Sequence, residues 1–173
     1  GTPLADRIFG GDGNDLLVGG DGIDFIYGEA GNDTIGDATP GADDAGDDFY
    51  FGGDGSDLFI WEPGDGQDTI DGSIGSDTVD AGDGNDRVIG DTPGFLGGGN
   101  DSLLGGQGND TIMGLTGDDV VDGMGGNDVV SGDDGNDTVF GGGGTDSLTG
   151  GNGNDIIRGH SGNDTMSGDS GND

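Results

Sequence analysis

Aspartate recurs along this chain at a spacing of nine residues, interrupted only by three short insertions. Two residues before each aspartate stands a glycine, except at the first, where the residue is Leu4. Carboxylate oxygens are hard ligands, and glycine-rich turns can direct several backbone carbonyls toward one point. Calcium suits such a set because it takes about six to eight oxygens in flexible geometry, whereas magnesium keeps its water and demands a tight octahedron. The candidate chemistry is therefore calcium coordination. The aspartates of the series are Asp6, Asp15, Asp24, Asp33, Asp48, Asp57, Asp68, Asp77, Asp86, Asp101, Asp110, Asp119, Asp128, Asp137, Asp146, Asp155, Asp164 and Asp173.

A large apolar residue stands two positions after every aspartate of the series except the last. The unit is G-G-x-G-x-D-x-U-x, with U apolar, so that a six-residue turn precedes a short strand with U on one face. Glycine at positions two and four permits positive φ, and we expect the asparagine common at position five to tolerate it as well. No helical periodicity competes with this pattern. The U residues are Ile8, Leu17, Ile26, Ile35, Tyr50, Phe59, Ile70, Val79, Val88, Leu103, Ile112, Val121, Val130, Val139, Leu148, Ile157 and Met166.

This nonapeptide resembles the calcium-binding repeat of RTX (repeats-in-toxin) proteins, and the resemblance extends over nearly the whole chain. It implies an all-β fold, a right-handed parallel β-roll, in which the metal takes carbonyl oxygens from the turn together with the aspartate at position six. That ligand role then falls on all eighteen aspartates of the series. The resemblance also implies a secreted bacterial protein whose repeats stay unfolded in a calcium-poor cytosol, pass a type I secretion channel and fold outside the cell.

Two units, or eighteen residues, would complete one turn of such a roll, which gives about nine turns and two short parallel sheets. Stacking places loops two units apart together, for example those of Asp110 and Asp128, whose carboxylates repel unless a cation lies between them. Two columns of loops leave room for up to about sixteen calcium ions. In the competing interpretation these aspartates cap the turn by hydrogen bonds to backbone amides, which we expect at one or two of them only.

The repeats form a single domain over residues 1–173, with three insertions that we expect to distort the neighbouring calcium sites. The insertions are residues 37–42, 61–62 and 90–95. Position one of the unit is not glycine at Asp43, Pro63, Ala81 and Leu96. Because the chain begins and ends within repeats, we interpret it as a segment of a longer protein.

The composition alone would indicate disorder, since 173 residues include 47 glycines, carry a formal net charge of −34 and are only 27% hydrophobic. The strict period predicts folding instead, but on condition that a cation offsets the mutual repulsion of the acids. The acidic charge argues against nucleic acid and anionic membranes as partners, and no segment reaches transmembrane length. The absence of cysteine and the single histidine, His160, exclude disulfides and thiolate or histidine-rich metal sites. We interpret His160 as a tolerated substitute for glycine at position two.

Outer strand positions near the N-terminus carry an unusual number of aromatic residues. An exposed aromatic strip usually marks contact with a protein partner or a covering domain. Alternatively, turns that lie outside this segment cover it. The residues are Phe9, Phe25, Tyr27, Phe49 and Phe51.

No sequence pattern for catalysis is present: there is no His-Glu-x-x-His, no Cys/His pair, no serine nucleophile elbow and no P-loop. We therefore expect a non-catalytic calcium-binding module that supports a secreted protein, not an enzyme. Two alternatives stay open. The chain could be the structural rod of an adhesin or surface-layer protein, or the accessory domain of a secreted protease, lipase or polysaccharide-modifying enzyme.

Overall fold

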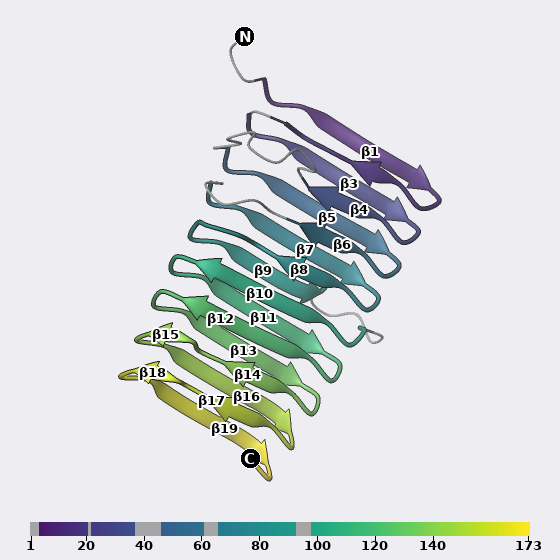
Figure 1. Ribbon diagram of the computed structural model, residues 1–173. Coiled ribbons are helices and arrows are strands. Elements are labelled where there is room, and N and C mark those ends of the chain that lie inside the picture. The colour runs from purple at the N-terminus through teal and green to yellow at the C-terminus, as the bar shows by residue number, and fades with distance from the viewer. Residues whose placement is uncertain (1–3, 21, 37–45, 61–65, 93–97) are drawn as a thin grey trace.

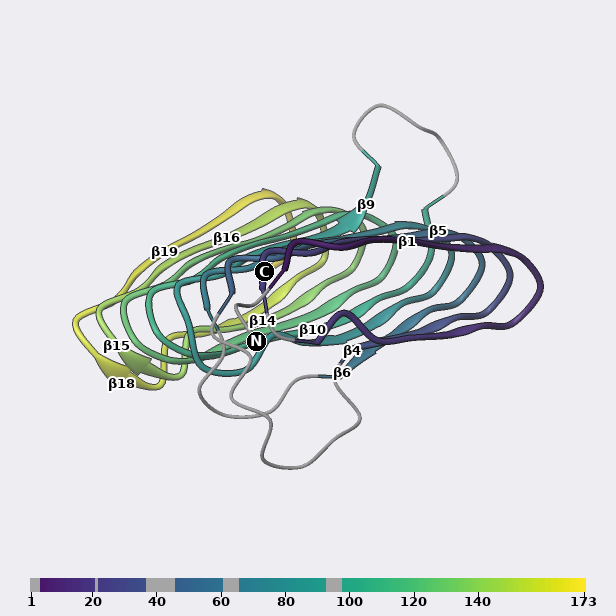
Figure 2. The same cartoon turned by 90° about the horizontal axis from the view of Figure 1, so that it is seen from above.

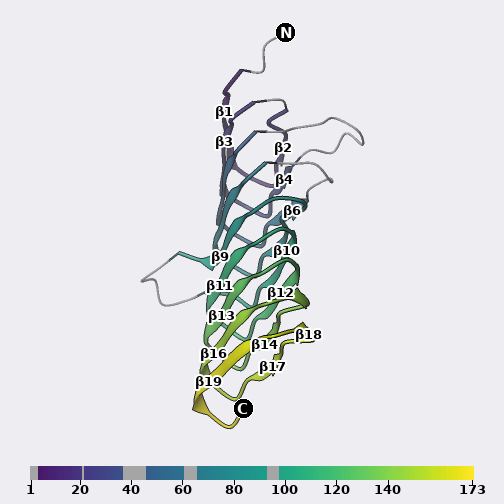
Figure 3. The same ribbon diagram turned by 90° about the vertical axis from the view of Figure 1, so that its left-hand side faces the viewer.

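The computed structural model describes residues 4–20, 22–36, 46–60, 66–92 and 98–173, and within these ranges every regular element is a β-strand. The strands form two parallel sheets that face each other along a spiral (Figures 1 and 3). The first sheet contains β1 (Arg7–Asp12), β3 (Phe25–Ala30), β5 (Phe49–Asp54), β7 (Thr69–Ile74), β9 (Arg87–Asp91), β11 (Thr111–Thr116), β13 (Val129–Asp134), β16 (Ser147–Gly153) and β19 (Thr165–Gly171). The second contains β2 (Leu16–Leu17), β4 (Thr34–Gly36), β6 (Leu58–Ile60), β8 (Thr78–Asp80), β10 (Ser102–Gln107), β12 (Val120–Gly125), β14 (Thr138–Phe140), β15 (Gly143–Gly144), β17 (Ile156–Arg158) and β18 (Ser161–Gly162).

The chain alternates between the two sheets, so that each coil adds one strand to each of them (Figure 2). The result is a β-solenoid of about 8 turns with a spacing of about 18 residues, close to the nine turns expected from the sequence. Ile112 pairs with Val130, eighteen residues further on. Where an insertion intervenes, Ile35 pairs with Phe59 and Tyr50 with Ile70, at separations of 24 and 20 residues, which are 18 plus the six and two inserted residues. The insertions therefore leave the register of the spiral unchanged.

The hydrophobic core is a single layer of U residues between the sheets. From Ile26 to Leu148 every U residue is at most 2% exposed, so the side-chain positions predicted from the period are confirmed. At the last turn Met166 is 54% exposed, since no further coil lies beside it among the described residues. Each coil thus contributes only two side chains to the core, and the interior is thin for a chain of this length.

Among the described residues, positive φ occurs at positions two and four of the turns and, outside them, at Gly36 at the end of β4. Every described non-glycine residue with positive φ, for example Met124 or His160, stands at position two. At position four, Gly126 has φ 142°, and a Cβ there would coincide with the carbonyl oxygen of Gly108 on the preceding coil. The expectation for position five is wrong, because no described asparagine has positive φ. These residues form a ladder instead: both the backbone N–H and the Nδ2 group of Asn127 donate to Oδ1 of Asn109, at 2.8 and 3.0 Å.

The third insertion enters the spiral later than the sequence pattern indicates. A Cβ added at a position-one glycine would contact Oδ2 of the aspartate in the same turn and the position-one carbonyl oxygen of the next coil. A Cβ at Gly90 would contact Oδ2 of Asp101 and the carbonyl oxygen of Gly114, which is the same pattern. Gly90 therefore occupies the place that the sequence pattern gave to Leu96, which lies outside the described residues, as do Asp43 and Pro63. Ala81 is described at position one and is fully buried.

The aromatic residues singled out in the sequence lie on the outer face of the first sheet, on β1, β3 and β5. Phe9, Tyr27 and Phe51 form one column, with ring centroids 5.0 Å apart and nearly parallel planes, and Phe25 and Phe49 form a second at 4.8 Å. The guanidinium group of Arg7 lies within 5.9 Å of three of these rings and donates a hydrogen bond to the Tyr27 hydroxyl. Because the rings stack along the spiral axis, they turn their edges outward.

Candidate metal centre

The position-six aspartates stand in two columns, one at the start of each sheet's strands. The spiral positions them, because each one ends a turn and its successor lies one coil further on. The column that precedes the first sheet is Asp6, Asp24, Asp48, Asp68, Asp86, Asp110, Asp128, Asp146 and Asp164, and the other is Asp15, Asp33, Asp57, Asp77, Asp101, Asp119, Asp137, Asp155 and Asp173. Fourteen of them are buried; Asp15 and Asp164 are half-buried, and Asp6 and Asp173 at the ends are exposed.

One carboxylate oxygen of each aspartate, except Asp6 and Asp15 at the start of the columns, is used to connect neighbouring coils. The backbone N–H of Asp110 donates to Oδ1 of Asp128 at 2.9 Å, and the backbone N–H of Asp101 donates to Oδ1 of Asp119 at 2.8 Å. The same bond joins every consecutive pair in both columns, at 2.6–3.1 Å. The expectation that amide capping would occur at one or two aspartates only is therefore wrong, and capping is general.

The insertions do not interrupt these columns. Across the first and third insertions the backbone N–H groups of Asp33 and Asp77 donate to Asp57 and Asp101 at 2.8 Å each, the distance found within uninterrupted coils. These hydrogen bonds between aspartates are thus the same beside the insertions as elsewhere, and the distortion of the neighbouring calcium sites stays a prediction.

The second carboxylate oxygen, Oδ2, is buried and accepts no hydrogen bond at most positions. This holds for Asp15, Asp24, Asp33, Asp57, Asp77, Asp101, Asp110, Asp119, Asp128, Asp137, Asp146 and Asp155. Asp48 differs, because its Oδ2 accepts a hydrogen bond from the hydroxyl group of Tyr50 at 2.8 Å. A buried anionic oxygen without a donor is costly, so this atom requires either a proton or a cation.

A backbone carbonyl approaches the same space. A Cβ placed on Gly123 would lie 2.5 Å from Oδ2 of Asp128 and 2.8 Å from the carbonyl oxygen of Gly141 on the next coil, and Gly105 has the same relation to Asp110 and Gly123, at 2.5 and 3.0 Å. Carboxylate and carbonyl oxygens therefore gather beside the position-one glycine, where a side chain would displace them. Such a set of hard oxygens fits calcium.

The electrostatics of the columns agree with an uncompensated negative charge. The pKa of Asp77, Asp101 and Asp119 is raised from 3.8 to about 7, mainly by burial and to a smaller extent by neighbouring carboxylates, against the backbone hydrogen bond to Oδ1, which lowers it. The pKa values of Asp57, Asp128 and Asp137 are raised to about 6, again mainly by burial. At these six aspartates desolvation thus outweighs the hydrogen bond.

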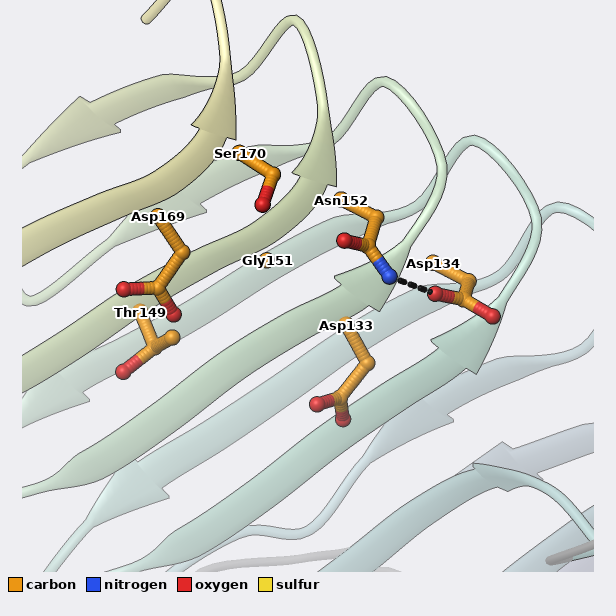
Figure 4. A pocket seen from close by; sticks show the side chains of 7 residues that line it. All are labelled: Asp133, Asp134, Thr149, Gly151, Asn152, Asp169 and Ser170. Carbon is orange, nitrogen blue, oxygen red and sulfur yellow. Dashed lines mark hydrogen bonds between the residues drawn. The ribbon is translucent and has the colours of Figure 1, made fainter.

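Other acids form a more open arrangement on the surface. Asp133, Asp134 and Asp169 line a shallow hollow at the end of β13, β16 and β19, with Gly151 between them (Figure 4). Asp134 accepts a hydrogen bond from Nδ2 of Asn152 at 2.6 Å, and Asp133 accepts one from the Ser131 hydroxyl. Asp169 likewise accepts a hydrogen bond, from the Ser167 hydroxyl, so the unpartnered buried oxygens of position six are not a general property of the acids in this protein.

No group of three or more histidine, cysteine, aspartate or glutamate side chains gathers as a metal cluster in the part of the chain that the structure describes. This follows from the single-file columns, in which any calcium ligand set must combine carboxylates with backbone carbonyls. One buried acid, Asp91, stands outside the series and was missed in the sequence, since it belongs to an insertion and matches no position of the unit. Among the described residues, no helix of sufficient length and apolarity to cross a membrane is found.

Comparison with known families supports the resemblance inferred from the sequence. The family model of the RTX calcium-binding nonapeptide repeat (4 copies) matches residues 1–35, 43–59, 63–92, 95–121, 104–139, 113–148 and 140–173. The unmatched residues fall at the three insertions. No curated protein matches the chain.

Proposed function

The chain belongs to the family of RTX calcium-binding nonapeptide repeats, and we propose that calcium held between successive coils is what stabilises its fold. Repeats of this family bind calcium and are characteristic of secreted bacterial proteins. The position-six aspartates and the turn carbonyls would hold the ions, and the chain would act as a non-catalytic module that supports a secreted protein. When bound, calcium supplies the positive charge that the buried columns lack.

The observation that carries this proposal is the unpartnered Oδ2 atom repeated along both columns. With Oδ1 fixed by the backbone of the preceding coil, Oδ2 is the oxygen left for a ligand role. A ligand that binds only the folded state stabilises it by RT ln(1 + [L]/Kd) at each site, so that many sites of modest affinity add up. Folding would then depend steeply on calcium concentration.

Such dependence would match the two environments that a secreted chain meets. In a cytosol with submicromolar calcium the chain would be unfolded and able to pass a type I secretion channel, and in millimolar calcium outside the cell it would fold. The aspartates would not act as general acids or bases, because one oxygen is tied to the backbone and the other is a metal ligand.

Circular dichroism of the full chain in EDTA and in millimolar calcium tests the proposal. We expect a coil spectrum in EDTA, a cooperative change to a β spectrum on calcium addition, and no such change with magnesium at equal concentration. Limited proteolysis under the same conditions should show rapid cleavage in EDTA and protection in calcium. A β spectrum that persists in EDTA at neutral pH would contradict the proposal.

The aromatic strip on β1, β3 and β5 favours a contact with another protein or a neighbouring domain. Phe9 is 55% exposed, and the stacked rings form a continuous apolar column on the outer face of the first sheet. We expect the calcium-loaded chain to bind the dye ANS at this strip and the double variant Phe9→Ser/Phe51→Ser to bind much less. Absence of dye binding by the unmodified chain would contradict an accessible apolar surface here.

A further inference from the structure

Asp91, at the end of β9, is a buried carboxylate that does not belong to the repeat. It is 2% exposed and lies in the third insertion. Unlike the position-six aspartates whose Oδ2 accepts no hydrogen bond, it has donors for both of its oxygens. Oδ2 accepts hydrogen bonds from the Thr116 hydroxyl at 2.8 Å and from the Thr116 backbone N–H at 3.1 Å, and Oδ1 accepts one from the backbone N–H of Gly99 at 3.3 Å.

The two backbone donors have different partners in uninterrupted turns. A position-four N–H donates to the position-three carbonyl of the next coil, as from Gly117 to Asp134 at 2.9 Å. A position-three N–H donates to the position-two carbonyl of the preceding coil, as from Gln107 to Gly82 at 2.8 Å. Gly99 stands at position four and Thr116 at position three. Both N–H groups would therefore bond to backbone carbonyls in a regular turn.

At the third insertion the backbone ladder stops early. β9 pairs with β7 as far as Asp91, opposite Ser73, but pairs with β11 only as far as Ile89, opposite Met113. In contrast, β11 and β13 continue their pairing to Thr116 and Asp134. The carboxylate of Asp91 receives the donors at the point where the pairing of β9 with β11 ends.

We propose that Asp91 is a splice residue: its carboxylate takes the place of the backbone carbonyls that accept from these two N–H groups in a regular turn, and so joins the Asp101 turn to the Thr116 turn of the next coil. Gly98 supports this arrangement, because a Cβ at that residue would collide with Oδ2 of Asp91 and with the Thr116 hydroxyl. The pair Asp91 and Gly98 thus forms a fitted contact.

The splice lies beside the candidate calcium loops. The charge of Asp91 acts on Asp77, Asp101 and Asp119, whose Oδ2 atoms are buried and accept no hydrogen bond. For calcium binding, this inference rests on the function proposed above. Asp91 would then be a positioning residue, which holds the loops of Asp77, Asp101 and Asp119 in place and is not itself a ligand. Its loss should weaken calcium binding at these loops more than at the loops near the C-terminus.

Residue-resolved amide hydrogen exchange of the calcium-loaded chain tests the splice. In Asp91→Ala we expect the amides of Thr116 and Gly99 to exchange about tenfold faster, the factor for the loss of one hydrogen bond. Gly126, which donates to Gly143 in a regular turn, should be unaffected. Asp91→Asn offers one acceptor oxygen in place of two and should restore protection at one of the two amides. The exposed acid Asp80 supplies a control of equal charge change, Asp80→Ala.

Gly98→Ala gives a second route to the same result without a change of charge and should expose the same two amides. Unchanged protection of Thr116 and Gly99 in both Asp91→Ala and Gly98→Ala would overturn the splice. If the unmodified chain proves equally folded in EDTA, the function proposed above fails, and the exchange experiment is run in EDTA with the same criteria. The two failures are therefore distinguishable.

Discussion

Replacement of Asp119 by asparagine separates the two roles of a position-six carboxylate. The amide oxygen can still accept the 2.8 Å hydrogen bond from Asp101, so the connection between coils is retained. The unpartnered Oδ2 becomes an NH2 group, which cannot ligate a cation and carries no charge. Asp119 is 1% exposed, so solvent does not mask the change.

The magnitude follows from linkage. Each saturated site adds about 1.4 kcal/mol of stability for each tenfold rise in free calcium. The loss of one site therefore makes the difference in unfolding free energy between Asp119→Asn and the unmodified chain grow by about 1.4 kcal/mol per decade of calcium. At low calcium the sign should reverse. The pKa of Asp119 is raised from 3.8 to about 7, so keeping the carboxylate charged at pH 7 costs on the order of 4 kcal/mol, which a neutral amide avoids.

The assay is urea unfolding followed by circular dichroism at several fixed calcium concentrations. Asp54→Asn is the matched control, because Asp54 is an exposed acid at position three and the substitution removes the same charge. We expect its effect to be small and independent of calcium. The difference in unfolding free energy between Asp119→Asn and the unmodified chain should grow over about a tenfold rise in calcium, for example from about 1 to 10 mM. If it stays the same, Oδ2 of Asp119 is not a calcium ligand.

Three further outcomes are expected. Because burial raises the pKa of Asp77 and Asp101 to about 7, the calcium-free fold is most stable below about pH 4 and loses that stability as the pH rises through 7. Protons should therefore compete with calcium, so that the calcium concentration at the folding midpoint, followed by circular dichroism, is higher at pH 5 than at pH 7. An unchanged midpoint would contradict the raised pKa values. Gly126→Ala should destabilise the calcium-loaded chain by about 2 kcal/mol or more, because φ is 142° and the Cβ meets the Gly108 carbonyl. By contrast, His160→Gly should be neutral or stabilising by up to about 1 kcal/mol in the same urea assay, because His160 has positive φ at position two. Tyr50→Phe removes the hydroxyl that donates to Oδ2 of Asp48 and should make folding more dependent on calcium. The unfolding free energy should then rise more steeply with calcium concentration than in the unmodified chain. An identical slope would show that this hydroxyl does not compete with the metal.

The spiral was predicted from the resemblance to RTX repeats, and the nine-residue period then assigned each side chain its place in it, because every feature that repeats has the same surroundings in each coil. Ile112 is buried for the same reason as Val130, and glycine at position four is required for the same reason in each coil. Even the unbroken register across the insertions follows from the pattern, since in-phase aspartates resume after each one. The position of Phe25 and Phe49 on one outer face was likewise predicted, whereas the stacking of their rings is seen only in the structure.

Features that occur once could not be predicted in this way. The sequence offers both Gly90 and Leu96 as the start of the Asp101 turn, and only the contacts of Gly90 with Asp101 and Gly114 decide between them. Asp91 gives no signal because nothing in the repeat predicts a carboxylate that substitutes for a carbonyl. The direction of Oδ1 toward the preceding coil was also hidden, because spacing shows which residues meet but not which of two equivalent oxygens takes the hydrogen bond.

Amide capping and the proposed calcium coordination, which the sequence presented as competing roles, are compatible in this structure, since they use different oxygens of the same carboxylate. The hydrogen bond to Oδ1 holds consecutive carboxylates of a column about 4.8 Å apart, the spacing of the coils. At an effective dielectric constant of about 20, two unit charges at that distance repel by about 3 kcal/mol, and each interior aspartate has two such neighbours. The capping ladder therefore creates a charge density that it cannot itself neutralise, since its donors reach only Oδ1. Protonation relieves this charge at low pH, as the raised pKa values indicate, and at neutral pH a divalent cation bound by Oδ2 would do so without loss of the ladder.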